Sequence, residues 1–176
     1  MLMDVSTLTD QAAVLVIGSY VERILEQAIL SRLIKMTKPQ IAGLFENGPL
    51  ASMIAKNKMG LALGLYDAAT FNDLEKIRQI RNAFAHSFHA ITFKNPTIRA
   101  YCREFASVTR FAQHQKPPAR SPFRKGTKWL GGVWHGSARN KFLLASITIG
   151  LGLTQYHFKP MRPKPLDREI VRGYFF

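Results

Sequence analysis

The chain has 176 residues, 47% of them hydrophobic, with 25 Lys and Arg against 11 Asp and Glu. This length predicts one domain with an extension, and the apolar content is enough for a core. No stretch reaches the roughly 20 apolar residues of a membrane span, and the acidic start lacks the basic region of a signal peptide. Because Cys102 is the only cysteine, an internal disulfide and a cysteine zinc site are excluded. We therefore expect a cytoplasmic protein with neither metal nor cofactor.

The positive charge is unevenly distributed. Residues 1–115 carry 13 Lys and Arg against 9 Asp and Glu, whereas residues 116–176 carry 12 against 2. This asymmetry predicts a nearly neutral globular part followed by a basic segment that prefers polyanions, RNA or DNA among them.

The first predicted helix runs from Thr9 or Asp10 to about Lys35. Thr7-x-x-Asp10 has the pattern of a capping box, and apolar residues follow at helical spacing. Glu22 and Glu26 are expected on its solvated face.

The second predicted helix spans about residues 49–65. It follows the turn signal Asn47-Gly48-Pro49, and proline suits a first helical turn. Its packing face is predicted to comprise small and apolar residues together with one lysine: Ala51, Ile54, Ala55, Lys58, Leu61, Ala62 and Leu65.

Two further helices are predicted before residue 116. Residues 70–88 form the third, with Thr70 as its cap and Asp73 in the capping-box position, and residues 98–115 form the fourth, capped by Thr97. Cys102 lies on the apolar stripe of the fourth helix and is interpreted as a core residue. The short connectors favour antiparallel neighbours, so the predicted fold class is all-α, an up-and-down bundle of about four main helices over residues 1–115.

Residues 116–176 are predicted to be a basic extension interrupted by proline and glycine. Lys116-Pro117-Pro118 ends the bundle, and residues 138–153 form a short apolar helix or strand. On one interpretation the extension is an arm that contacts nucleic-acid phosphates; on the other, Trp129, Trp134 and residues 142–153 fold back and complete the core. The candidate nucleic-acid-binding residues are Arg124, Lys125, Lys128, Arg139 and Lys141.

The most specific pattern is Arg81-Asn82-Ala83-Phe84-Ala85-His86, near the end of the third predicted helix. An arginine within an apolar stripe is costly unless it is paired or does chemistry, and a histidine titrates near neutral pH. At 100° per residue, Arg81 and His86 lie about 140° apart and cannot easily meet on one helix. A site that used both would need a bent helix or a second copy of the chain, as in a symmetric homodimer.

This hexapeptide, together with Gly48-Pro49-Leu50, residues 58–65 and residues 74–80, is similar to the mannitol operon repressor family. Arg81-x4-His86 also resembles the signature of the HEPN superfamily (higher eukaryotes and prokaryotes nucleotide-binding). The resemblance covers about residues 10–112 and implies an all-helical, HEPN-like bundle. It also implies a regulatory repressor that acts as a homodimer through the helix carrying Arg81, with nucleic-acid or protein partners.

The HEPN resemblance implies a second function, that of a metal-independent ribonuclease. His86 would then be the general acid or base, Arg81 would hold the phosphate and Asn82 would orient the site. Alternatively, all three residues are structural: Arg81 pairs with Glu75 or a partner's carboxylate, His86 caps a helix end and Asn82 bonds to backbone. No helix-turn-helix with a basic recognition helix is evident, so direct base reading has no support.

Overall fold

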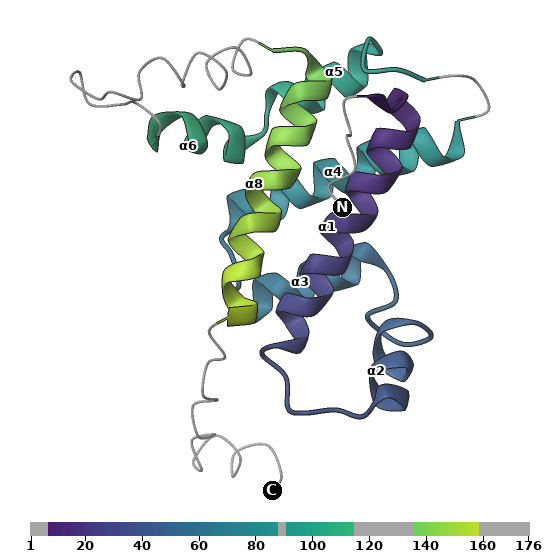
Figure 1. The fold of residues 1–176 in the computed structure, drawn as a ribbon, viewed down its shortest axis with the longest axis vertical. Coiled ribbons are helices and arrows are strands. Elements are labelled where there is room, and N and C mark those ends of the chain that lie inside the picture. Colours follow the sequence, from purple (N-terminus) through teal and green to yellow (C-terminus); the bar gives the residue numbers. More distant parts are fainter. Residues whose placement is uncertain (1–6, 88–90, 115–135, 159–176) are drawn as a thin grey trace, which may run out of the picture.

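The computed structural model describes residues 7–87, 91–114 and 136–158. They contain helices and no strand (Figure 1): α1 (Asp10–Leu30), α2 (Lys38–Phe45), α3 (Met53–Ala62), α4 (Ala68–His86), α5 (Pro96–Arg103), α6 (Ala106–His114) and α8 (Ala138–Phe158). The predicted all-α fold class is confirmed. Within the described ranges, no helix has both the length and the apolar character needed to cross a lipid bilayer.

Helix α1 follows its sequence signals closely at the N-terminus. Thr9 is the N-cap, and its hydroxyl accepts a hydrogen bond from the Ala12 N–H. One face of α1 is buried from Ala13 to Ile29. The helix ends at Leu30, earlier than predicted, where the Ser31 hydroxyl donates to the Ala28 carbonyl.

Helix α4 lies at the centre of the molecule and packs against α1, α3, α5, α6 and α8. Its N-cap is Asp67, whose carboxylate accepts from the Thr70 N–H, so the prediction that Thr70 is the cap was wrong. Asp73, predicted to complete a capping box on this helix, is fully buried and binds another segment.

The carboxylate of Asp73 explains why the predicted helix over residues 98–115 is two helices. It accepts hydrogen bonds from the N–H groups of Ala106 and Ser107, the first residues of α6. Lys76 donates to the carbonyl of Glu104 just before them. A buried carboxylate at a helix start accepts from N–H groups that have no partner within the helix, so α5 ends at Arg103 and α6 begins in a new direction. Asn95, rather than Thr97, is the N-cap of α5.

Helix α8 belongs to the same hydrophobic core as the helices before residue 115. Phe142, Ala145, Ile149 and Leu153 are buried there, and Phe142 lies against Phe93, which in turn contacts Phe84. The boundary predicted at residue 115 therefore does not separate the core from the extension. The buried positions of α8 recur every three to four residues, so one face of this largely apolar helix completes the core. Trp129 and Trp134 lie outside the described residues.

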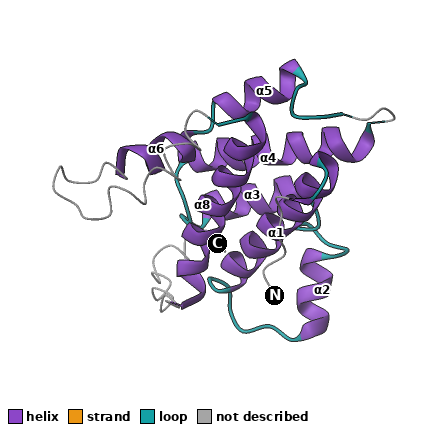
Figure 2. Ribbon diagram, turned by 45° about the horizontal axis from the view of Figure 1, so that its top comes forward, coloured by secondary structure: helices purple, strands orange, loops and turns teal. Residues whose placement is uncertain are grey.

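Helices α1 and α8 lie side by side and run in the same direction (Figures 1 and 2). Arg139, at the start of α8, pairs with Asp10 at the start of α1. Near the middle of the two helices, a Cβ placed on Gly150 would lie 3.2 Å from the Tyr20 ring. The first and last described helices are thus joined along their length.

Candidate functional site

Arg81 lies between α4 and α1. Its aliphatic stem packs on Gly18, where an added Cβ would be 3.1 Å from the Arg81 Cδ, and its Nη2 lies 3.8 Å from the Glu22 Oε2. The Nε is buried without a hydrogen-bond partner in the described structure. A glycine at position 18 is what allows α1 to approach this long side chain. The ion-pair partner is Glu22 and not Glu75, which binds Arg78 instead.

Glu22 belongs to a charge cluster that also contains Lys56, Glu26 and Arg81. The Lys56 Nζ lies 3.2 Å from the Glu22 Oε1 and 2.8 Å from the Glu26 Oε2, and it stands 5.9 Å from the centre of the Phe45 ring. Only 6% of Lys56 is exposed. Burial by itself would lower the pKa of Lys56, but the hydrogen bonds and charges of Glu26 and Glu22 outweigh it and raise the pKa above its ordinary value. Glu22 and Glu26 therefore do not form the solvated face that was predicted.

A second polar network joins α3 to α4 through Asn57, which is fully buried. Its Nδ2 donates to the Phe71 carbonyl and, at 2.8 Å, to the Glu75 Oε1. The Tyr66 hydroxyl shares its single proton between the Asn57 Oδ1 and the Asn57 carbonyl oxygen, each at 2.8 Å. Burial and the negative charge of Glu75 raise the pKa of Tyr66 well above its ordinary value. Tyr66 therefore stays neutral and serves as a hydrogen-bond donor.

These two networks show that the packing face predicted for α3 was wrong. The buried positions are Met53, Lys56, Asn57 and Gly60, whereas Lys58 and Leu61 are exposed. The prediction followed apolar residues alone, and polar side chains with partners on α1 and α4 can be buried equally well. The adjacent pair Lys56-Asn57, at i+3 and i+4 from Met53, was a signal for this face.

The three residues of the Arg81-x4-His86 motif face different neighbours within one chain. Arg81 contacts α1, whereas Asn82 lines a hollow together with Ile91, Ile98 and Tyr101 on the side of α5. His86 is exposed in the last turn of α4. Within the described residues, no hydrogen bond or ion pair connects Arg81 to Asn82 or to His86.

Of the basic residues predicted to bind nucleic acid, Arg139 and Lys141 are described, and Arg124, Lys125 and Lys128 lie outside the described residues. The Arg139 Nη1 lies 2.7 Å from the Asp10 Oδ1, and its Nη2 donates to the Leu8 carbonyl at 2.7 Å. Arg139 therefore fastens the start of α8 to the start of α1.

Lys141 borders a cavity next to Cys102. Burial raises the pKa of the Cys102 thiol to about 12, and the positive charge of Lys141 acts in the opposite direction. The thiol is therefore protonated near neutral pH, and the interpretation of Cys102 as a core residue is confirmed.

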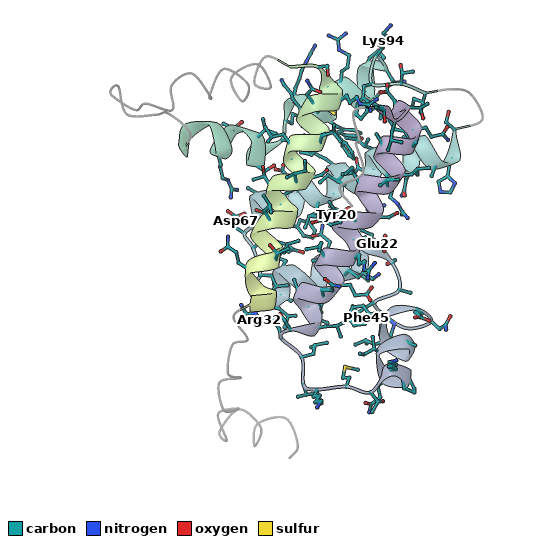
Figure 3. The ribbon with its side chains drawn as sticks, in the orientation of Figure 1. Tyr20, Glu22, Arg32, Phe45, Asp67 and Lys94 are labelled. Atoms are coloured by element: carbon teal, nitrogen blue, oxygen red, sulfur yellow. The ribbon has the colours of Figure 1, made fainter. Side chains whose placement is uncertain are left out.

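Figure 3 shows how far apart these two groups of charges lie: Glu22 is part-way along α1, and Lys94, which borders the same cavity as Lys141, is beyond the start of that helix. The charges around Glu22 pair with one another and tie three helices together. The cavity beside Lys141 is lined by further cations, Lys94 among them.

The mannitol repressor family matches residues 11–124, which include α2 to α6 and all of α1 except Asp10. Neither curated proteins nor solved structures give a match. The matched region covers more than half of the chain and contains Glu22, Lys56 and Arg81, the charge cluster that joins α1, α3 and α4. The chain belongs to the mannitol repressor family.

Proposed function

We propose that this protein is a repressor that lowers expression of genes for mannitol use, and that it acts by binding a partner rather than by catalysis. The observation that carries the proposal is the family match over residues 11–124. The geometry of α4 supports binding over catalysis, because Arg81 is held by Glu22 and Gly18 while Asn82 faces the other side of the helix.

The test is to delete the gene in the organism that carries it and to measure transcripts of the genes for mannitol uptake and breakdown. A repressor predicts that these transcripts rise in the absence of mannitol and fall again when the gene is restored. Transcripts for the uptake of an unrelated sugar serve as the control. Unchanged mannitol transcripts in the deletion strain would overturn the proposal.

The ribonuclease is the competing function, and two observations favour testing it. The Arg81 side chain is 32% exposed and His86 is exposed, so a phosphodiester could reach both if a second copy completed the site. We expect no RNA cleavage by the full chain in EDTA. Cleavage that disappears in both Arg81→Ala and His86→Ala, but not in a control variant at the exposed Arg23, would establish the enzyme instead.

Self-association through the exposed side of α4 is part of the proposal. Because α1 covers the Arg81 face of α4, the contact would use exposed positions such as Gln79 and His86. Sedimentation at micromolar concentration should give a dimer mass. Gln79→Glu would place like charges opposite each other across a two-fold axis and shift the equilibrium toward monomer. A monomer mass for the unchanged chain contradicts this interface.

A further inference from the structure

The cavity bordered by Lys141 lies where the starts of α1 and α8 meet α5, and it has a volume of about 450 Å³. Among the described residues, five cations line it, together with one carboxylate, that of Asp10. Cavities that hold small ligands measure about 300–1,000 Å³, so this one has the size for a compact molecule and not for an extended strand.

The carboxylate in the cavity is already occupied. The Asp10 Oδ1 binds Arg139, and its Oδ2 accepts a hydrogen bond from the Phe93 N–H at 3.1 Å. Asp10 therefore offsets the charge of Arg139 and leaves four cations around the hollow: Lys94, Arg99, Arg103 and Lys141. Among the described residues, no ion pair connects any of these four to a carboxylate.

The four cations come from three segments that the fold holds in fixed positions. Arg99 and Arg103 are one turn apart on α5, so their side chains leave the same face. Lys141 is in the first turn of α8. Lys94 follows Phe93, whose ring lies between those of Phe84 and Phe142 with centre-to-centre distances of 5.3 and 5.7 Å. This aromatic contact anchors the segment that carries Lys94.

The start of α8 adds a further favourable field. Ser137 caps this helix of 21 residues, and its hydroxyl accepts from the Asn140 N–H. Ser137 also borders the cavity, so the positive end of the helix dipole opens toward it. Like charges close together repel one another, and an anion with two negative charges relieves that repulsion while accepting several hydrogen bonds.

We propose that this cavity binds a small phosphomonoester through Lys94, Arg99, Arg103 and Lys141. The two arginines of α5 donate hydrogen bonds to the phosphate oxygens, and Lys141 and the start of α8 add positive electrostatic potential. The rest of the ligand lies in the remaining volume of the cavity. The inference goes beyond the proposed function, because it concerns a ligand of the protein and holds whether or not the protein represses mannitol genes.

The test uses the full chain in a phosphate-free buffer at constant ionic strength. Calorimetry and thermal melting are measured with glucose 6-phosphate, with inorganic phosphate and with glucose. Glucose 6-phosphate should bind and raise Tm, inorganic phosphate should bind more weakly, and glucose should do neither. Absence of binding by glucose 6-phosphate at millimolar concentration overturns the proposal.

Two pairs of variants locate the site. Arg99→Gln with Arg103→Gln should weaken glucose 6-phosphate binding at least tenfold, because it removes two charge-assisted contacts. The matched pair Arg23→Gln with Lys58→Gln removes the same charge from exposed positions on α1 and α3 and should bind as the unchanged chain does. Equal loss in both pairs would mean general attraction to a basic protein, which overturns the site.

A last arm distinguishes the source of the phosphate. A single-stranded oligonucleotide without terminal phosphates is titrated into the same variants. If binding of the oligonucleotide requires Arg99 and Arg103, and glucose 6-phosphate cannot displace it, the cavity binds a nucleic-acid backbone. The small-ligand proposal is then wrong. If only the binding of glucose 6-phosphate requires these arginines, the proposal is supported.

Discussion

The two ends of α1 handle charge in opposite ways. In its second half, Glu22 and Glu26 meet Lys56 and Arg81, so positive and negative groups neutralise one another inside the contact between three helices. At its start, Asp10 neutralises Arg139 alone, and Lys94, Arg99, Arg103 and Lys141 surround a hollow. The first arrangement satisfies itself and fixes helix positions, whereas the second leaves positive charge that an external anion can satisfy.

The largest effect is expected from Phe142→Ala, because the cavity end depends on the aromatic core beneath it. Phe142 is fully buried and contacts Phe93, which carries Lys94 next to it. Removing the ring should cost about 3–5 kcal/mol of unfolding free energy and weaken glucose 6-phosphate binding. Leu151→Ala, on the same helix but at a residue that is 61% exposed, should cost far less. Equal urea midpoints for the two variants would show that α8 is not part of the core.

Lys56→Met tests the charge cluster around Glu22 in the second half of α1. It leaves Glu22 and Glu26 facing each other without their shared cation, so the free energy of unfolding should fall by about 3 kcal/mol, at the low end for a broken buried pair because the carboxylates are partly exposed. Lys58→Met, two positions along and exposed, should change it by less than about 0.5 kcal/mol.

Adding Glu26→Gln to Lys56→Met should restore part of the loss, since Glu22 still pairs with Arg81 and no carboxylate of the cluster then lacks a cation. Glucose 6-phosphate binding should be unchanged in all of these variants that fold. Urea unfolding measures the first effect and calorimetry the second. A Lys56→Met protein as stable as the unchanged chain would mean that the cluster does not hold the helices.

Gly60→Ala should have an intermediate effect on the neighbouring Asn57 network. An added Cβ would overlap the Tyr66 hydroxyl and displace it from Asn57, with a net loss of about 2 kcal/mol even though alanine favours a helix. Gly43→Ala in α2, which has nothing within 4 Å of the new Cβ, should instead stabilise the protein by about 0.5–1 kcal/mol. Thermal unfolding measures the stability of both variants. A Gly60→Ala protein more stable than the unchanged chain would contradict the packing described.

The smallest effect concerns the exposed cap of α4 and depends on pH. Hydrogen bonds from the Thr70 N–H, from Arg110 and from the Thr70 hydroxyl lower the pKa of Asp67 to about 2. Since the folded pKa is below the ordinary value near 3.9, this contribution is present above about pH 4 and is lost as the pH falls toward 2.

Asp67→Ala should therefore cost about 1 kcal/mol at pH 7, the usual value of an N-cap, and almost nothing near pH 2. Asn72→Ala, exposed on the same helix, should show no such dependence on pH. Urea unfolding at pH 7, 4 and 2 measures both. A difference that persists undiminished at pH 2 would rule out the charged cap.

The sequence predicted what local chemistry decides. The start of α1 at Thr9 and Asp10, the all-helical class and the burial of Cys102 all follow from caps and apolar spacing. The face of α3 could not be found this way, because the burial of Lys56 depends on carboxylates of α1, 34 residues away in the case of Glu22. Spacing in the sequence shows which residues share a face of one helix. It does not show which residues of another helix pair with the polar side chains on that face.

The same reason explains the other errors. The break between α5 and α6 comes from Asp73, which lies 33 residues before Ala106, and the place of α8 in the core depends on Phe93 and α1. For the cavity, charge in the sequence drew attention to Arg139 and Lys141, whose binding of nucleic acid stays a prediction. It gave no sign of Lys94, Arg99 and Arg103, because these line the cavity only when α5 meets α8.

The parallel pairing of α1 with α8 has a consequence for the order of folding. Arg139 and Asp10, which join the starts of these two helices, are 129 residues apart. During synthesis, the side of α1 that α8 will cover has no partner until nearly the whole chain has left the ribosome. Pairings this distant in sequence slow folding and leave apolar surface open to wrong contacts. The contact between α1 and α8 can therefore form only after α8 has been synthesised, and we expect chaperones to bind the chain mainly before that point.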